Sequence, residues 1–417
     1  MFNPRTPIYL SHAPIPSVTH FALIAALEAG VRGTLLSTMP LVILRGFGDT
    51  QSSSLIYFCV GVLSLLAGLM VPFANRYVPR RWMMTVAGGL YLVGMVLAVA
   101  GRPWLMAAAL LVNAVGTVTF TVCLSSYVLD YIDRSNLGRN ESTRMLFSAL
   151  PWTVFPALGV FLYAWWHPAP FLLAGFFSCA MVAVFWWLRL GNGKQIARAA
   201  GPAPNPLAYL GRFFRQPRLI AGWLFASIRS SGWWVFVVYL PYFCIDAGLG
   251  DKVGGIAASV ANGFLLITPV MLRLVQRFSV RVTVRFTFAL AGVLFTAAFL
   301  VSHWPWVTVG CLMAAAVCLV MLDVCAGLPF LMAVKPSERT EMAAVYASFR
   351  DVSGIATPAV ASALLAFAPV ASVFAAAGAG MAAAWAIAGR LHPRLGRPRI
   401  ANGPDDQVLR RAKHLRR

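Results

Sequence analysis

Long apolar stretches separated by short polar segments dominate the chain from residue 18 to residue 390. A helix needs about 20 mainly apolar residues to cross a bilayer, so the pattern predicts twelve membrane-spanning helices. The stretches are too long and too uniformly apolar for the alternating strands of a membrane β-barrel. The twelve predicted spans cover residues 18–44, 53–74, 82–101, 104–130, 145–166, 170–190, 219–245, 253–275, 282–302, 305–334, 342–366 and 369–390.

The composition supports this reading. Hydrophobic residues make up 59% of the 417 residues and charged residues only 11%, whereas about a quarter of the residues in a soluble domain are charged. A soluble enzyme, a disordered chain and a fibrous protein are therefore excluded. The net charge of +21 does not predict a nucleic-acid partner, because the basic residues are not gathered in a soluble domain.

The sequence offers little for metal or cofactor chemistry. All seven cysteines lie in apolar stretches, without a CxxC pair or a nearby histidine at metal-ligand spacing, so we expect neither disulfides nor a metal site. The sequence also lacks the short motifs typical of nucleotide binding, of serine hydrolases and of zinc proteases. We therefore expect no cofactor and no enzymatic activity.

Basic residues predict the orientation, since cytoplasmic loops carry an excess of lysine and arginine. With the N-terminus placed in the cytoplasm, 28 of the 34 basic residues fall on the cytoplasmic side. The outer loops then hold only Arg45, Arg102 and Lys252. The expectation is a multi-pass protein of the cytoplasmic (inner) membrane with both termini in the cytoplasm.

An internal repeat divides the spans into two halves. A shift of 201 residues brings Pro40 onto Pro241 and Arg76 onto Arg277. Two six-helix halves of the same orientation imply a parallel repeat about an axis along the membrane normal. The expected domains are a first bundle (1–190), a cytoplasmic linker (191–217), a second bundle (218–391) and a basic tail (392–417). Residues 207–218 mix apolar and basic residues in the manner of an interfacial helix.

Two six-span halves, a long central loop and a basic loop after spans 2 and 8 resemble the major facilitator superfamily. The best local match is the loop after span 2, where the family pattern is roughly Gly-x3-Asp-Arg-x-Gly-Arg-Arg. Here Asn75 stands in place of the acid and Pro79 in place of the second glycine. The resemblance assigns inner-gate roles to Asn75, Arg76, Arg80, Arg81, Arg277 and Arg281, and, at the inner end of span 4, to Asp130 and Asp133.

Charges inside the spans are the leading functional candidates, because they are costly in a bilayer. Glu28 and Arg32 are four residues apart and so share one face of span 1. Arg229 lies 201 residues after Glu28, at the equivalent depth of span 7. We therefore expect Glu28, Arg32 and Arg229 to form a charged cluster in a central cavity. The alternative is an ion pair that only holds the structure together.

Spans 10 and 11 add three charges. Asp323 is predicted to face a cavity, opposite the stripe of Cys311, Cys318 and Cys325; the alternative is a structural bond to a neighbouring hydroxyl or arginine. Arg350 is expected to meet Asp323 or a substrate anion. Asp351 is expected to meet a basic residue near the cytoplasmic gate.

Span 7 also carries aromatic candidates for the substrate site. Trp233, four residues after Arg229, is expected to stack on its guanidinium. Trp233 or Trp234 is expected to contact substrate, although a packing or lipid-facing role is the commoner one for such residues.

These features predict a secondary active transporter that works by alternating access around a midplane site. Glu28, upstream of Pro40 in span 1, resembles the embedded acid of bacterial multidrug/proton antiporters, so Glu28 and then Asp323 are the proton-coupling candidates. Proton-coupled export of a small organic solute is favoured over uptake of an anionic metabolite. A receptor or assembly factor on the same fold is the alternative of another class. Expected partners are the solute, protons and membrane lipid, with the protein a monomer and no nucleic acid bound.

Overall fold

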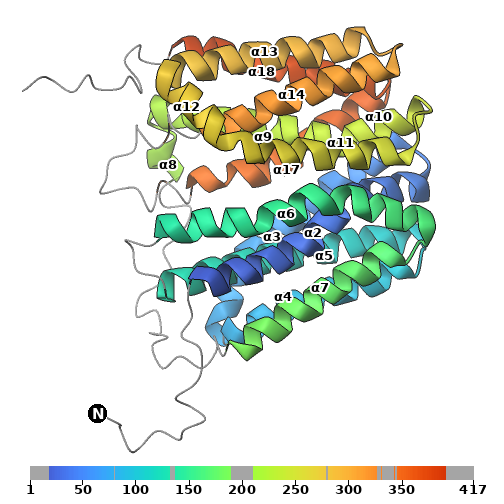
Figure 1. Cartoon of the computed structure of the whole chain (residues 1–417), viewed down its shortest axis with the longest axis vertical. Helices are drawn as coiled ribbons and strands as arrows, with labels where there is room; N and C mark the ends of the chain where they lie inside the picture. The colour runs from blue at the N-terminus through green and yellow to red at the C-terminus, as the bar shows by residue number, and fades with distance from the viewer. Residues whose placement is uncertain are drawn as a thin grey trace, which may run out of the picture.

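In the computed structural model, the residues described are 18–78, 80–131, 137–188, 210–278, 280–325, 330, 342 and 345–390. Within them the backbone is helical, without strands. The helices gather into two bundles, drawn blue to green and yellow-green to red in Figure 1. The first bundle contains α2 (Val18–Phe47), α3 (Thr50–Tyr77), α4 (Arg80–Val99), α5 (Pro103–Tyr131), α6 (Leu137–Trp165) and α7 (Ala169–Trp187).

The second bundle is less regular. Predicted span 7 is α9 (Pro217–Trp234) continued through a π-helix, η2 (Val235–Tyr239), into α10 (Leu240–Asp246). Predicted span 8 is α11 (Asp251–Gly263), a 3-10 segment η3 (Phe264–Ile267) and α12 (Thr268–Phe278). The remaining helices are α13 (Val280–Leu300), α14 (Pro305–Cys325), α17 (Phe349–Leu365) and α18 (Ala371–Gly389).

All twelve predicted spans coincide with helices in the described residues. Nine described helices are long and apolar enough to cross a membrane. Two of the other three spans contain η2 and η3, and the third, α17, has only 17 residues in the described part of the chain. Spans 7 and 8 are helical as predicted, but each contains a segment that is not α-helical, η2 and η3. Residues 326–329 and 331–334 of predicted span 10 lie outside the described residues.

Some hydroxyl groups inside the spans donate to the carbonyl groups of the preceding helical turn, which satisfies them without water. In α2 the hydroxyl of Thr34 donates to the carbonyl of Gly30, and that of Thr38 to the carbonyl of Thr34, both at 2.8 Å.

The turn between α2 and α3 contains Gly48, which has a φ of 70°. Asp49 then caps α3 by accepting hydrogen bonds from the backbone of Gln51 and Ser52, which is the usual role of an N-cap acid.

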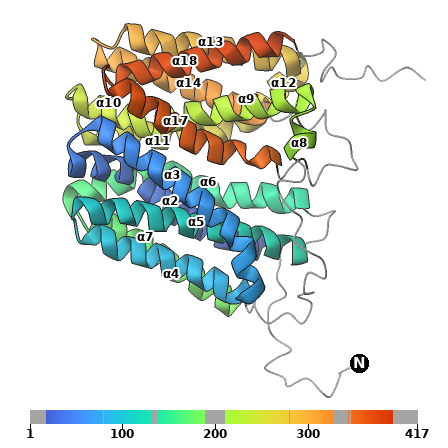
Figure 2. The same ribbon diagram turned by 180° about the vertical axis from the view of Figure 1, so that it is seen from behind.

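The two bundles meet along two helix pairs, α3 with α17 and α6 with α11. Small residues permit the close approach. A methyl group placed on Gly61 of α3 would lie 3.0 Å from the carbonyl oxygen of Gly354 in α17, and one on Gly255 would lie 2.9 Å from Val160. From this crossing, α3 and α17 diverge toward the end of the molecule that carries α8 (Leu210–Phe213) (Figure 2).

At the opposite end, which carries α10, polar contacts join the bundles. Arg45 of α2 forms an ion pair with Asp251 of α11. The hydroxyl of Tyr239 donates to Ser54 at 3.1 Å. The backbone amide of Ala157 also donates to the hydroxyl of Ser259 at 2.8 Å. We refer to these two ends as the α8 end and the α10 end.

Residues 207–218 were expected to form an interfacial helix, but the described part of this segment differs from that expectation. Leu210–Phe213 is helical, and the next helix, α9, begins only at Pro217. Phe213 is fully buried in a small cluster with Leu219, Phe330, Met342 and Val345. This side chain therefore packs into the protein, while Arg212 and Phe214 are exposed. Residues 207–209 lie outside the described residues.

Candidate functional site

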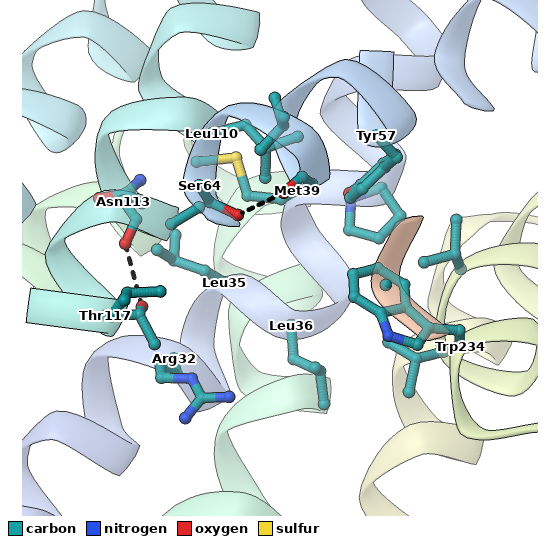
Figure 3. Close-up of a pocket in the computed structure, with 18 of the residues that line it drawn as sticks. Arg32, Leu35, Leu36, Met39, Tyr57, Ser64, Leu110, Asn113, Thr117 and Trp234 are labelled. Carbon is teal, nitrogen blue, oxygen red and sulfur yellow. Dashed lines mark hydrogen bonds between the residues drawn. The ribbon is translucent and has the colours of Figure 1, made fainter. Parts of the chain in front are cut away.

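A cavity of about 370 Å³ lies between the two bundles. The first bundle supplies most of its wall through α2, α3, α5 and Trp152 of α6, and the second supplies Trp234, Val237 and residues of α17. Figure 3 shows Arg32 and Trp234 on facing sides of the cavity, with Leu36 between them. The wall is largely apolar and aromatic, with a few charged and polar groups, which is typical of a site for a small organic molecule.

The α2 pair behaves as its spacing predicts. Glu28 is buried, and its carboxylate lies 3.5 Å from the guanidinium of Arg32. The Tyr91 hydroxyl donates to the same carboxylate oxygen at 3.2 Å and lies 2.9 Å from the hydroxyl of Thr117. The Arg32 side chain is 44% exposed and lines the cavity, where its guanidinium lies over the ring of Trp152, 5.1 Å from the centroid.

The equivalent residue of the second bundle pairs elsewhere, so the predicted cluster with Arg229 is wrong. Arg229 lies 2.9 Å from Asp323 of α14 instead of meeting Glu28. The indole N–H of Trp233 donates to the other oxygen of Asp323 at 2.9 Å. The guanidinium of Arg229 stacks over Phe349 at 5.3 Å, not over Trp233 as expected. The physical reason is that α14 presents a carboxylate to the face of α9 that carries both residues.

Asp323 does not line this cavity and instead makes the bond to a neighbouring arginine that was the alternative expectation. Cys318 and Cys325 are buried and Cys311 is partly buried, whereas the Asp323 side chain is 32% exposed. Arg350 lies close enough to Asp323 to interact with it electrostatically, in line with one of the two partners expected for it. Its guanidinium also lies 5.6 Å from the ring of Phe349.

Asp351 lies at the cavity wall with Arg350, rather than only at a cytoplasmic gate. Trp234 reaches the same wall, packing its ring edge-on to Tyr57 at 6.1 Å and close to Gly354. Trp233 and Trp234 therefore have separate surroundings: Trp233 contacts Asp323, and Trp234 lines the cavity.

The predicted gate residues are only partly described. The side chains of Asn75, Arg76, Arg80 and Asp130, and the whole of Asp133, lie outside the described residues. Arg81 is exposed. Arg277 lies over the ring of its neighbour Phe278 at 5.7 Å. Arg281 donates to the carbonyl of Gly389 at 2.7 Å, so it binds the end of α18 within its own bundle.

Several site residues escaped the sequence analysis. Tyr91, Trp152 and Phe349 contact the charged residues, and Tyr57 and Asn113 line the cavity. In the sequence they are aromatic or polar residues within apolar stretches, without a spacing that marks them. The repeat offers one signal, because Gly354, 202 residues after Trp152, also lines the cavity.

Within the described part of the chain, no group of histidine, cysteine and acidic side chains is placed to hold a metal ion. Two helical bundles around a shared cavity, with acid–arginine pairs in both, define a polytopic membrane protein of the transporter class. The model of the Major Facilitator Superfamily matches residues 21–358, and the chain belongs to this family. A search of curated protein sequences finds no match.

Solved structures support the same fold. A mutant form of the nucleoside transporter NupG gives a TM-score of 0.67 at 11% identity, over 90% of this chain and 100% of that one. A bacterial homologue of the iron transporter ferroportin, in an inward-facing state, gives 0.66 at 15% identity, over 89% and 98%. A bacterial metal transporter gives 0.61 at 14% identity, over 90% and 99%. Identities this low establish the fold alone.

Proposed function

We propose that this protein is a proton-coupled secondary transporter that takes up a small organic solute bearing a carboxylate. The solute binds in the cavity between the bundles, which rock about it to give alternating access. The α8 end faces the cytoplasm, in keeping with the distribution of basic residues. Glu28 carries the coupled proton, and Arg32 receives the carboxylate.

The observation that carries this proposal is the position of Arg32 between Glu28 and the cavity. Its guanidinium lies 3.5 Å from the Glu28 carboxylate while 44% of its side chain is exposed. The ionised carboxylate balances the positive charge of Arg32. A proton on Glu28 removes this balance, so Arg32 then attracts a solute anion more strongly.

The proton and the solute therefore favour each other's binding. This coupling is reciprocal, because a solute carboxylate on Arg32 must favour the protonated form of Glu28 to the same degree. Two ligands that bind together to the same state cross the membrane together. The geometry thus favours cotransport with protons, which in a cell drives uptake.

Export is the second candidate. It rests on Glu28 lying upstream of Pro40 in α2 and on the aromatic wall formed by Trp152 and Trp234, which suits an amphipathic organic solute. In that case protonation of Glu28 and solute binding exclude each other. The two directions therefore predict opposite movements of solute under the same pH gradient.

The test uses purified protein in liposomes with radiolabelled L-phenylalanine and N-acetyl-L-phenylalanine, two aromatic carboxylates. With an acidic exterior, the wild type should accumulate at least one of them above its external concentration. Glu28→Gln, which resembles the protonated acid, should still bind the solute but fail to accumulate it. Asp246→Asn, the same change at an exposed acid near the α10 end, is the matched control and should accumulate it normally.

Protein-free liposomes correct for passive entry. Accumulation by Glu28→Gln equal to the wild type would overturn the role of Glu28. Release of preloaded solute under an acidic exterior, in place of accumulation, would overturn uptake in favour of export. Binding without any pH-driven movement in either direction would overturn proton coupling.

A further inference from the structure

Six charged residues within the spans, three arginines and three acids, bear on the class of solute. The three arginines suggest an anion when they are considered alone. The three acids accompany them, so an anion entering the cavity meets both signs of charge. The six residues are Arg32, Arg229 and Arg350 with Glu28, Asp323 and Asp351.

Two of these charges neutralise each other. Arg229 and Asp323 lie 2.9 Å apart, with side chains only 13% and 32% exposed, and Trp233 donates to the second carboxylate oxygen. Neither residue is part of the cavity wall. Arg350 is at the wall but also interacts with Asp323 and stacks on Phe349.

Of the other charged residues, Arg32 and Asp351 line the cavity from different bundles. Arg32 comes from α2, and its 3.5 Å distance to Glu28 exceeds that of a normal hydrogen bond. Asp351 comes from α17, is exposed at the wall, and lies beside Arg350, which interacts with it electrostatically. One wall thus offers donors to a carboxylate, and the other offers an acceptor to an ammonium group.

Between these charges the cavity provides aromatic surfaces. Trp152 lies beneath the Arg32 guanidinium at 5.1 Å, and Trp234 reaches the wall from the second bundle. Leu35, Leu36 and Met39 of α2 add apolar surface. Such surfaces suit an apolar or aromatic body.

On the basis that this cavity is the transport site, we propose that the solute is a small zwitterion with an aromatic or apolar body. Its carboxylate binds Arg32, its ammonium group binds Asp351, and its body lies against Trp152 and Trp234. Because the two charges belong to different bundles, the solute bridges them. An anion lacks the ammonium group that would bind Asp351, and the Asp351 carboxylate repels it.

The test compares three probes with the same body and different charge. L-phenylalanine is a zwitterion, N-acetyl-L-phenylalanine an anion, and L-phenylalaninamide a cation at pH 6. Isothermal titration of the purified full-length protein in detergent should give a Kd for L-phenylalanine at least about tenfold lower than for either analogue. This measurement needs no gradient, so it is independent of proton coupling and direction.

Two variants connect the preference to the residues. Asp351→Asn should bind L-phenylalanine and its N-acetyl analogue equally, because the discriminating carboxylate is gone, whereas Asp246→Asn should keep the full preference. Unchanged melting temperatures show that both variants are folded. Equal or tighter binding of the N-acetyl analogue by the wild type, or binding of none of the three probes, would overturn the proposal. Tight binding and proton-driven uptake of the N-acetyl analogue would overturn it while leaving the proposed function intact.

Discussion

The guanidinium of Arg229 in α9 lies 2.9 Å from the carboxylate of Asp323 in α14. Trp233, one helical turn beyond Arg229, donates its indole N–H to the same carboxylate. α9 therefore holds α14 through two side chains on one face. Glu28 occupies the position equivalent to Arg229 in the first bundle, and it pairs within its own helix instead.

We predict that Arg229→Ala destabilises the protein by about 3 kcal/mol, because it leaves a partly buried carboxylate without its counter-charge. Replacing both partners, Arg229→Leu with Asp323→Leu, should be less harmful than the single change, because no charge is left unpaired. Thermal unfolding of the purified variants in detergent measures both effects. A double variant less stable than Arg229→Ala would contradict this account.

The ion pair between Arg45 and Asp251 is expected to hold the α10 end closed. It is partly exposed, and such pairs contribute at most about 1 kcal/mol. Arg45→Ala should therefore raise the ratio of open to closed molecules up to about fivefold. Spin labels at the outer ends of α3 and α11 report this ratio as a distance distribution.

The exchanged pair, Arg45→Asp with Asp251→Arg, is the control for that experiment. It should return the distribution toward that of the wild type, since the attraction is restored in reverse. A distribution unaffected by Arg45→Ala would show that the hydrogen bond between Tyr239 and Ser54 is sufficient to close this end.

Gly61 is expected to be essential for movement of the bundles. A methyl group there would lie 3.0 Å from the Gly354 carbonyl and 3.2 Å from Ile355, so Gly61→Val should separate α3 from α17 and abolish transport. Gly89→Val is the matched control, because a methyl group on Gly89 meets no atom within 4 Å. Uptake assays and melting curves together distinguish lost movement from unfolding, and equal activity of the two variants would contradict the prediction.

Asp49, which lies outside the predicted spans, makes a pH-dependent contribution to the stability of the folded protein. The side-chain hydrogen bond from Ser52 holds the pKa of the Asp49 carboxyl below its ordinary value of 3.8. The stabilisation is therefore present above that ordinary pKa and is lost as the pH falls through the folded-state value. Asp49→Ala should cost about 1 kcal/mol at pH 7.

The Asp49→Asn variant distinguishes the contribution of the N-cap hydrogen bonds from that of the carboxylate charge. The amide oxygen still accepts from the backbone of Gln51 and Ser52, so most of the stability should remain at pH 7. The difference between wild type and Asp49→Ala should shrink on lowering the pH to 3, whereas that between Asp49→Asn and Asp49→Ala should not. Unfolding curves at the two pH values measure both differences.

The sequence predicts the spans and the family well because the signals are local. Length and uniform hydrophobicity locate α2 to α5, α7, α13 and α18 within a few residues, and the spacing of Glu28 and Arg32 predicts their pairing on one helix.

The partner of Arg229 is not predictable in this way. Whether Arg229 pairs with Glu28 or with Asp323 depends on how α9 is rotated and on which helix packs against it. The apolar sequence of the spans predicts neither the rotation nor the neighbouring helix. For the same reason Tyr91, Trp152 and Phe349 are unmarked in sequence, although each touches a charged residue.

Because of the π-helix η2, the helical geometry of span 7 differs from that of span 1, although the corresponding residues are equally spaced in the sequence. Glu28 and Pro40 are separated by twelve residues, as are Arg229 and Pro241. Between the first two the helix is α throughout, but between the second two it passes through Val235–Tyr239. A π-turn takes up one extra residue, and each residue of an α-helix turns by about 100°. The α10 segment is therefore rotated about the helix axis, relative to α9, by about the 100° that one residue contributes. The hydrogen bond from Tyr239 to Ser54 depends on this rotation. Deleting a single residue within η2 would straighten the helix and turn α10 away from the first bundle.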